Sequence, residues 1–369
     1  MSKILIVSLE YPPQVGGIAS YVQNFAAHLP LESVVIYAPK IKGDYDYDVK
    51  NPWKVYRRSP YWFLWPRWLR MLWQLNIIIK KEKIEKIYIQ HALPVGYVAY
   101  LIKKIKKIPY IVFFHGTDLT LGLTKKVHKL SLVCRSAEQV IVSSNFLKTK
   151  LLSKLDDLKN VKVINPCPGD LFLQPINQEE VDKIKSQLAL SGKKVIISVS
   201  RLADGKGFPH LIRVMPDILR KVPNLVWLIV GDGPKREAIV NLVQQYKLQN
   251  VVRFIGQINY EELPKFYHLA DLFVLLTHKD ETTEEGWGTV FLEAAACGLP
   301  VVAGKVGGVD ETIEHSRTGI LVDIYQGANV AASIADILLD EDFAGQMGLA
   351  GRERVLNEFT WEKQIAKIG

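Results

Sequence analysis

The sequence predicts an α/β protein with two doubly wound domains, each built around a parallel β-sheet. Short apolar runs rich in β-branched residues alternate with amphipathic stretches along the chain, which is typical of parallel strands covered by helices on both faces. The runs form two series, one on each side of a segment with two prolines. The chain has 369 residues, enough for two domains of ~150 residues or more.

Each series contains six runs that we expect to be strands. The first comprises Ile4–Leu9, Val34–Tyr37, Ile87–Ile89, Tyr110–Phe114, Gln139–Val142 and Val161–Ile164. The second comprises Val195–Val199, Leu225–Val230, Val251–Ile255, Leu272–Leu276, Pro300–Ala303 and Gly319–Val322.

The domain boundary is expected in the segment Asn165–Phe172, because its prolines and glycine interrupt regular structure after a strand. We therefore predict domains at residues 1–168 and 169–355, followed by a C-terminal segment at 356–369. In that segment Thr360 is expected to cap a helix that begins before Glu362.

The composition excludes several classes of protein. Hydrophobic residues make up 48% and charged residues 23% of the chain, so the chain is neither disordered nor collagen-like. Cys134, Cys167 and Cys297 are too scattered for a disulfide framework or a structural zinc site. The first residues lack the features of a signal peptide, and no run of ~20 apolar residues predicts a membrane-spanning helix. We expect a cytoplasmic protein whose net charge of +9 suits phosphate or a lipid surface.

Two loops of the first domain carry candidate ligand-binding residues, since ligands of open α/β sheets lie beyond the carboxyl ends of the strands. Gly16 and Gly17 follow the first strand and begin a helix, where backbone amides can approach a phosphate. A plain tight turn is the alternative. His115, with Gly116 and Asp118, follows the strand at Tyr110–Phe114 and can contact a substrate hydroxyl. A histidine that satisfies the loop backbone is the alternative there.

Two loops of the second domain carry charged candidates. Arg201 and Lys206 follow its first strand and can converge on a diphosphate. Glu285 precedes a helix expected at Thr289–Cys297 that carries Glu293, and carboxylates of this kind suit sugar and ribose hydroxyls. The alternative interpretation is a set of solvated surface charges.

Other patterns argue against competing functions. The alternating aspartates of Asp44–Asp48 lack the glycine of a calcium loop, so a solvated loop is expected there. Residues 231–234 are too short for a phosphate-binding loop of the G-x-x-x-x-G-K-[ST] type. The chain contains neither a dinucleotide-binding fingerprint nor the nucleophile elbow of serine hydrolases.

Together these motifs resemble family 4 of the retaining glycosyltransferases, and the resemblance covers essentially the whole chain. The motifs are Gly16-Gly17, His115-Gly116-x-Asp118, Arg201-x4-Lys206, Gly231-Asp-Gly-Pro, and Glu285-x7-Glu293 followed by Pro300-Val-Val-Ala. The resemblance implies the GT-B architecture, in which two Rossmann-like domains face a central cleft. It also implies a C-terminal helix that crosses back to the first domain, beginning near Phe359. One departure is Asn165–Asp170, where many members carry Asn-Gly-Val-Asp.

The resemblance also implies roles for the charged residues. Arg201 and Lys206 would hold the donor diphosphate, and Glu293 would bind the nucleotide ribose. Glu285 would hold hydroxyls of the transferred sugar, with His115 nearby as a further catalytic residue. The family needs neither a metal nor a cofactor. Because no nucleophile is evident, the acceptor is expected to attack from the same face, with the leaving phosphate as base.

Several backbone positions are assigned to the donor by the same resemblance. Gly16 and Gly17 would let the first domain approach the donor phosphate. Gly231 would lie against the donor, and the amides of Thr289 and Val290 would assist with the phosphate.

A segment rich in tryptophan and arginine is the candidate acceptor or membrane surface. Aromatic and cationic residues together are typical of interfacial segments. The candidates are Tyr11, Trp62, Trp65, Arg67 and Arg70, with a second basic cluster at Lys103–Lys107. The alternative is that Trp68, Met71, Leu72 and Leu75, which have helical spacing, simply pack on the sheet.

The sequence thus predicts a retaining, metal-independent hexosyltransferase that uses a nucleotide sugar, with GDP-mannose as the first choice. Its motifs look closest to mannosyltransferases that act on phosphatidylinositol-type lipids. The expected acceptor is a lipid-linked substrate or a glycan, at the inner face of the cell membrane, and no nucleic acid partner is expected. The alternatives are a UDP-hexose-dependent enzyme with a soluble acceptor, a sugar-nucleotide epimerase, and a basic binding module without activity. The oligomeric state stays open.

Overall fold

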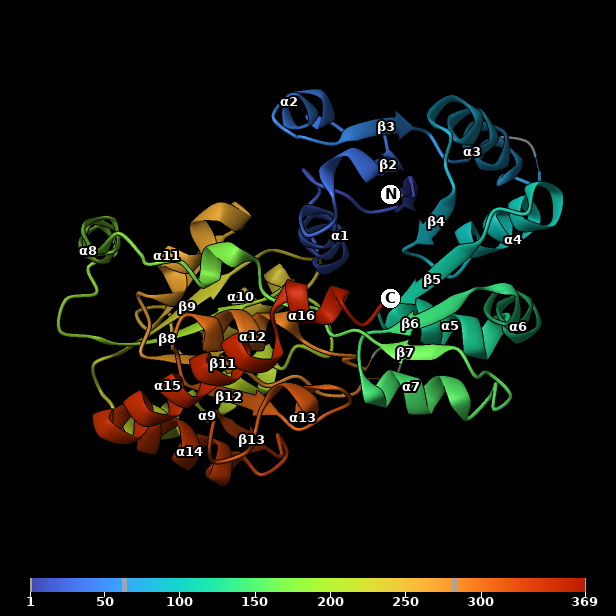
Figure 1. Ribbon diagram of the computed structural model, residues 1–369. Helices are drawn as coiled ribbons and strands as arrows, with labels where there is room; N and C mark the ends of the chain where they lie inside the picture. Colours follow the sequence, from blue (N-terminus) through green and yellow to red (C-terminus); the bar gives the residue numbers. More distant parts are fainter. Residues whose placement is uncertain (1, 62–64, 281–283, 369) are drawn as a thin grey trace. The chain divides into compact units, whose positions relative to one another are not determined.

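The computed structural model describes residues 2–61, 65–280 and 284–368, and the chain forms two units (Figure 1). The first unit consists of Met1–Pro166 together with Trp361–Gly369, and the second of Cys167–Thr360. The sequence-based boundaries were 168/169 and 355/356. Each unit has its own parallel sheet and its own core, and each is described below by itself.

The first unit contains a seven-stranded parallel sheet with the order β3-β2-β1-β4-β5-β6-β7. Its strands are β1 (Ile4–Val7), β2 (Val34–Pro39), β3 (Lys54–Arg58), β4 (Lys86–Ile89), β5 (Tyr110–Phe114), β6 (Gln139–Val142) and β7 (Val161–Val163). Its helices are α1 (Gly17–Ala27), α2 (Asp44–Val49), α3 (Leu69–Glu82), α4 (Val95–Lys106), α5 (Thr117–Lys125), α6 (Val127–Ser136), α7 (Asn145–Leu152) and α16 (Trp361–Ile365), with a 3₁₀ turn at Leu31–Ser33. Every residue of β1 and β5 is buried, as expected for strands with helices on both faces.

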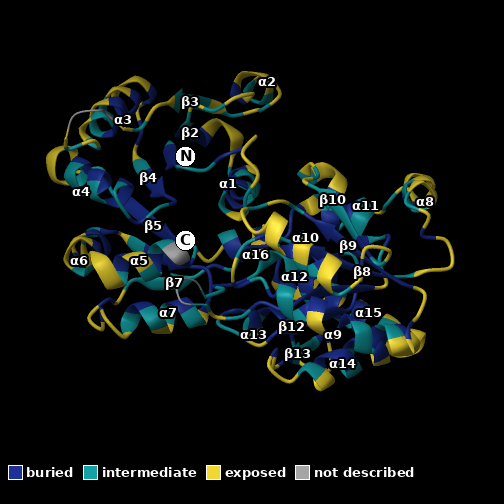
Figure 2. Cartoon of the chain, turned by 180° about the vertical axis from the view of Figure 1, so that it is seen from behind, coloured by how far each residue is buried: buried dark blue, intermediate teal, exposed yellow. Residues whose placement is uncertain are grey.

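The second unit contains a six-stranded parallel sheet with the order β10-β9-β8-β11-β12-β13. Its strands are β8 (Lys194–Val199), β9 (Leu225–Val230), β10 (Val252–Gly256), β11 (Leu272–Leu275), β12 (Val301–Gly304) and β13 (Ile320–Val322). Its helices are α8 (Gln178–Gln187), α9 (Phe208–Lys221), α10 (Arg236–Gln245), α11 (Leu263–Tyr267), α12 (Thr289–Ala296), α13 (Val309–Thr312), α14 (Gly327–Leu339) and α15 (Glu341–Glu358), with 3₁₀ turns at Asp170–Phe172 and Tyr260–Glu262. The inner strands β8, β9, β11 and β12 are almost completely buried, the edge strands β10 and β13 are half-buried, and the outer faces of the helices are exposed (Figure 2).

Each sheet has one point at which its strand order reverses. In the first unit the chain proceeds from β1 to β2 and β3 on one side, then crosses to β4 on the other side of β1. In the second unit the equivalent pair is β8 and β11. The loops that leave such a pair diverge and form a crevice at the carboxyl edge, where open α/β sheets bind ligands.

The region between β2 and α3 differs from the expectation. The solvated loop expected at Asp44–Asp48 is instead the start of helix α2, and β3 follows it. Asp48 accepts two hydrogen bonds from the Arg57 guanidinium, at 2.9 Å each, which ties the helix to the strand. β3 was missed because it is an edge strand with charged residues at Lys54, Arg57 and Arg58, so it contains no continuous apolar run.

The C-terminal helix packs on the first unit, as the resemblance implied. Trp361 in α16 contacts Tyr21 of α1, with ring centroids 5.2 Å apart. Gln364 Oε1 accepts a hydrogen bond from the Asn165 backbone at 3.0 Å. Helix α16 begins at Trp361, before Glu362 as expected, but the buried hydroxyl of Thr360 makes no hydrogen bond within the described part of the chain and so does not cap it.

Candidate functional site

An ion pair lies at the crevice of the second unit. Lys206, in the loop after β8, places its Nζ 2.6 Å from Oε2 of Glu285, in the segment that joins β11 to α12. The Lys206 charge lowers the pKa of Glu285, and hydrogen bonds from the backbone of Trp287 and Gly286 lower it further, although burial opposes them. Glu285 is therefore an ionised carboxylate. The two residues lie together in the structure, in agreement with their assignment to one site from the sequence.

Close backbone contacts fix the loop that carries Lys206. Gly207 has a φ of +76°, and a Cβ added there would lie 1.9 Å from the carbonyl oxygen of Leu276. The carbonyl oxygen of Gly205 also accepts a hydrogen bond from the backbone of His278 at 2.9 Å. The loop after β8 is thus attached to the end of β11, which holds Lys206 opposite Glu285. Arg201, at the start of this loop, is exposed and forms no ion pair with any described residue.

Gly231 is required by packing. Its φ is +127°, and a Cβ there would lie 2.0 Å from the carbonyl oxygen of Ser200. This contact accounts for the glycine without a ligand, so a donor contact at Gly231 stays a prediction.

Helix α12 begins at the crevice with amide groups that have no partner within the helix. Gly288 precedes it with a φ of +92° and provides no side-chain cap. The amides of Thr289 and Val290 belong to the first turn, where backbone N–H groups have no partner within the helix. Together with the helix dipole, these groups favour an anion.

Glu293 is buried inside α12, and only 5% of it is exposed. Its Oε2 accepts a hydrogen bond from the Tyr267 hydroxyl at 2.9 Å. Burial raises the pKa of Glu293 to about 7, although the bond from Tyr267 counteracts part of this effect. Burial also raises the pKa of Tyr267 well above its usual value, so the phenol stays a donor. Interpreting Glu293 as a solvated surface charge is therefore wrong.

His115 lies at the carboxyl end of β5 in the first unit and is neutral. Burial lowers its pKa to about 3, with a smaller contribution from His91. Its Nε2 is 3.0 Å from Oε1 of Gln90, so Nε2 donates and Nδ1 is left as the acceptor. Asp118 accepts hydrogen bonds from the backbone of His115 and Leu119, at 3.1 and 2.8 Å, and thereby shapes the turn into α5.

Helix α1 begins with paired glycines, and sterics do not require a glycine at the second of them, Gly17. A Cβ added to Gly17 would meet nothing within 4 Å, and one added to Gly16 would lie 3.4 Å from Oε2 of Glu10. Packing within the described residues therefore does not explain Gly17, which leaves backbone access for a ligand as the prediction.

Comparison with known proteins places this geometry in a family. Residues 15–167 match the model described as "Glycosyltransferase Family 4", and residues 180–354 match that of "Glycosyl transferases group 1". An uncharacterised glycosyltransferase of Methanocaldococcus jannaschii is 30% identical over 384 residues, which cover 99% of this chain and 96% of that protein. The chain belongs to glycosyltransferase family 4.

Other relatives of this glycosyltransferase are similar over their whole length. The GDP-mannose-dependent alpha-(1-6)-phosphatidylinositol monomannoside mannosyltransferase of Mycolicibacterium smegmatis is 29% identical, with 99% of this chain and 97% of that protein covered. Among solved structures, Anabaena HepE in complex with UDP-glucose superposes with a TM-score of 0.84 at 21% identity, covering 100% of this chain and 99% of that one. These matches confirm the expected GT-B fold.

The predicted acceptor residues of the glycosyltransferase lie in different environments. Tyr11 is completely buried, with Asn51 donating to its hydroxyl at 3.0 Å, so its side chain cannot contact a lipid surface. Trp62 lies outside the described residues. Trp65 and Arg67 are exposed, and Arg70 donates a hydrogen bond to the Tyr61 carbonyl at 3.4 Å.

The alternative for the following helix is confirmed for its inner face. Met71 and Leu75 are completely buried, and Trp68 and Leu72 pack against the same core. Among the described residues no helix is both long and apolar enough to cross a bilayer.

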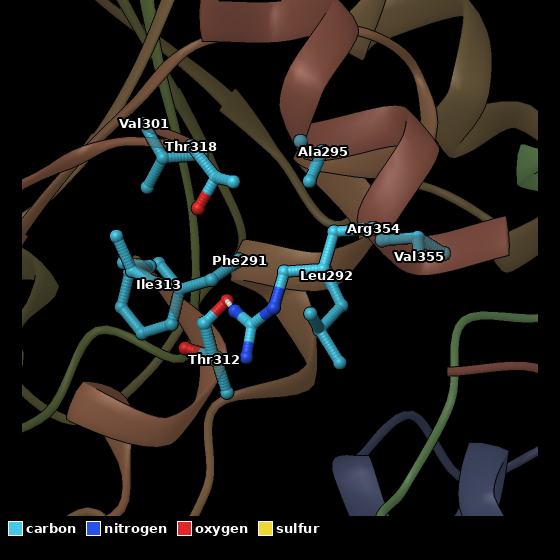
Figure 3. Close-up of a pocket in the computed structure, with 10 residues that line it drawn as sticks. Phe291, Leu292, Ala295, Val301, Thr312, Ile313, Thr318, Arg354 and Val355 are labelled. Carbon is cyan, nitrogen blue, oxygen red and sulfur yellow. Dashed lines mark hydrogen bonds between the residues drawn. The ribbon is translucent and has the colours of Figure 1, made fainter. Parts of the chain in front are cut away.

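An enclosed cavity in the second unit is too small for a substrate. It lies among residues of α12, α13, β12 and α15, including Phe291, Thr312 and Arg354 (Figure 3). Its volume of about 10 Å³ has room for one water molecule at most. The Arg354 guanidinium donates to the carbonyl oxygens of Thr312 and Glu311, at 2.9 Å each, so this region is structural.

Proposed function

We propose that the protein is a retaining, metal-independent mannosyltransferase that transfers mannose from GDP-mannose to a hydroxyl of a phosphatidylinositol-type lipid at a membrane surface. The observation that carries the proposal is the 2.6 Å pair of Lys206 and Glu285 at the second unit's crevice. Arg201 is exposed in the same loop as Lys206, and α12 starts close to Glu285. The full-length similarity to the Mycolicibacterium smegmatis mannosyltransferase supports the choice of donor and acceptor.

The cations of this crevice suit the leaving group. Breaking the bond between the anomeric carbon and the phosphate oxygen develops negative charge on the diphosphate. Lys206 and Arg201 provide two preorganised positive charges, and the first-turn amides of α12 add hydrogen-bond donors. These groups supply stabilisation of the kind that a metal ion provides in other transferases.

The two carboxylates suit the neutral parts of the donor. Glu285 is ionised and can accept hydrogen bonds from the hydroxyls of the transferred mannose. Glu293 would accept from the ribose hydroxyls, with Tyr267 fixing its other oxygen. Because Lys206 compensates its charge, Glu285 is a weak nucleophile, which favours transfer without a covalent glycosyl-enzyme.

Retention then follows from attack on the face that the diphosphate leaves. The acceptor oxygen forms a bond to the anomeric carbon as the bond to the β-phosphate oxygen breaks. The acceptor proton passes to that phosphate oxygen, so no protein base is required. The products are the α-mannosylated acceptor and GDP.

An exposed apolar stripe supports a membrane-bound acceptor. We use "stripe" for Trp65, Leu69, Trp73 and Ile77, whose exposed fractions are 89%, 40%, 64% and 47%. The last three are four residues apart in α3 and so share one face of the helix, while Met71, Leu75 and Ile78 are buried on the opposite face. A helix in solution normally exposes a polar face, so a second apolar face indicates a partner.

Positive charges around the stripe favour an anionic bilayer as the partner. Arg70 and Lys81 flank the stripe on α3, Lys80 continues it, and Arg67 precedes the helix. Aromatic residues with flanking lysine and arginine are typical of segments that lie in the headgroup region of membranes. We therefore propose that this face of α3 seats the enzyme peripherally on the inner face of the membrane.

The donor assignment is tested by thermal unfolding with GDP-mannose, UDP-glucose and ADP-glucose. A donor that binds the native state raises the melting temperature, and we expect GDP-mannose to give the largest increase. A larger increase with UDP-glucose would show that the donor is a UDP-sugar, and it would leave the family assignment unchanged. Transfer of labelled mannose to phosphatidylinositol vesicles in EDTA, with the product's anomeric configuration determined by NMR, tests metal independence, the acceptor and retention together.

A further inference from the structure

A polar cluster at the crevice of the first unit has no role in the chemistry described so far. Glu10 follows β1, and Gln90 and His91 follow β4. β1 and β4 are the neighbouring strands at which the order of this sheet reverses. The cluster therefore occupies the position at which open α/β sheets bind ligands.

The hydrogen bonds of His91 determine where its proton lies. The backbone N–H of Leu9 donates to Nδ1 of His91 at 3.3 Å, so Nδ1 is the acceptor and the proton is on Nε2. This Nε2 is buried and has no hydrogen-bond partner among the described residues. Oε1 of Glu10 lies 3.9 Å away, which is too long for a hydrogen bond.

Gln90 presents a second donor of the same kind. It is completely buried, and its Oε1 accepts from His115 at 3.0 Å. Its amide nitrogen is buried and makes no hydrogen bond within the described residues. Unsatisfied buried donors are rare in native proteins. Two of them on consecutive residues, beside a carboxylate whose side chain is 34% exposed, point to a ligand that supplies oxygen atoms.

We propose that Glu10, Gln90 and His91 form a binding site for the hydroxyl groups of a carbohydrate or cyclitol, through which the first unit holds the acceptor. A hydroxyl is the neutral group that can accept from Nε2 of His91 and donate to Oε1 of Glu10. An oxygen ~2.8 Å from each atom fits the 3.9 Å between them. The amide of Gln90 donates to a neighbouring hydroxyl. The carboxylate of Glu10 repels phosphate, so the site selects neutral polyols.

Gly16 faces this carboxylate. A Cβ at Gly16 would lie 3.4 Å from Oε2 of Glu10, in van der Waals contact with it. The assignment of the bound polyol as the acceptor rests on the proposed transferase function, whereas the binding of hydroxyl groups does not.

The direct test is an NMR titration of the full-length protein labelled at histidine, with myo-inositol and methyl α-mannopyranoside as probes. We expect one of these polyols to shift the His91 Nε2 resonance saturably, and inorganic phosphate to leave it unchanged. Glu10→Gln, which retains the shape of a partly exposed side chain, should weaken polyol binding by ~10-fold or more because a charge-assisted bond is lost. The matched variant Glu32→Gln, at an exposed position of the same unit, should bind as the parent does.

Two results would overturn the site: a His91 resonance that no polyol shifts in the folded protein, or one that phosphate alone shifts. If Glu10→Gln bound polyols as tightly as the parent, Glu10 would not be part of the binding site. Calorimetry with GDP-mannose on the same samples separates the two proposals. Donor binding without polyol binding rejects this site and leaves the donor assignment intact, whereas polyol binding without donor binding does the reverse.

Discussion

The crevices of the two units occupy equivalent places in their sheets but differ in charge. In the second unit two opposite charges meet at 2.6 Å, with an exposed arginine and a helix N-terminus beside them. In the first unit the carboxylate of Glu10 lies near His91, and the buried donors of Gln90 and His91 have no partner among the described residues. The first arrangement suits a polyanion that carries hydroxyls, and the second suits neutral hydroxyls alone. One fold thus provides two kinds of site through the few residues that follow its central strands.

The largest effect is expected from removing the cation of the second crevice. Lys206→Ala deletes a charge that stabilises the departing diphosphate, and the loss of one such group costs ~10²–10³ in kcat. The control is Lys194→Ala, because Lys194 forms an ion pair of the same 2.6 Å length with Glu341 in the same unit, at the other end of β8. Steady-state transfer measures both. Near-normal turnover of folded Lys206→Ala would contradict the proposal that the second crevice stabilises the departing diphosphate.

The next effect concerns the ribose. Glu293→Gln retains the shape of the side chain but loses its charge and one acceptor oxygen, so donor Kd should rise by ~10-fold or more. Calorimetry with GDP-mannose measures this change, and a 2′,3′-dideoxy analogue provides the control. Wild-type protein that binds the analogue as tightly as GDP-mannose would contradict a ribose contact at Glu293.

Ionic strength should separate the two crevices without mutation. Salt screens the attraction between the donor diphosphate and the cations Arg201 and Lys206, so raising the ionic strength should weaken GDP-mannose binding several-fold. Binding of a neutral polyol at Glu10 and His91 should change little. Parallel titrations at low and high salt measure this contrast, and an equal response of both ligands would show that the crevices do not differ in the way proposed.

The surfaces of the two units differ as their crevices do. Exposed apolar residues of the second unit, such as Leu349, are scattered, whereas Trp73 and Ile77 belong to the stripe on α3. Replacing Trp73 and Ile77 by serine should reduce cosedimentation with phosphatidylserine vesicles several-fold. Leu349→Ser, at a position 70% exposed, should leave it unchanged. Equal vesicle binding by all three proteins would leave the stripe without its proposed partner and favour a soluble acceptor.

The sequence predicted those parts of the fold and site that depend on local pattern. Buried strands such as Tyr110–Phe114 are continuous apolar runs, so their bounds agree with the structure. β3 has no such run, and the bond between Asp48 of α2 and Arg57 of β3 is not indicated by spacing alone. The resemblance in motif order assigned Lys206 and Glu285 to one donor site, although they are 79 residues apart in the sequence.

Other residues that contact the site residues are not marked by any sequence motif. Tyr267, 26 residues before Glu293, lies in a short helix without a motif. His91 and Glu10 meet only because β1 and β4 are neighbours in the sheet, which a single sequence does not specify.

The smallest expected effect is a pH dependence of stability that comes from Glu293 in the second crevice. Burial raises the pKa of Glu293 to about 7, whereas the carboxyl has its ordinary, lower pKa in the unfolded chain. Between these two values the native state binds more protons than the unfolded state, so this group lowers the stability of the fold as pH rises through the interval. Glu293→Gln lacks the titration. The difference in melting temperature between this variant and the parent should therefore move in favour of the variant from pH 5 to pH 8. A pH-independent difference for Glu293→Gln would mean that the native carboxyl titrates at its ordinary pKa, which would contradict the buried acid described at the second crevice.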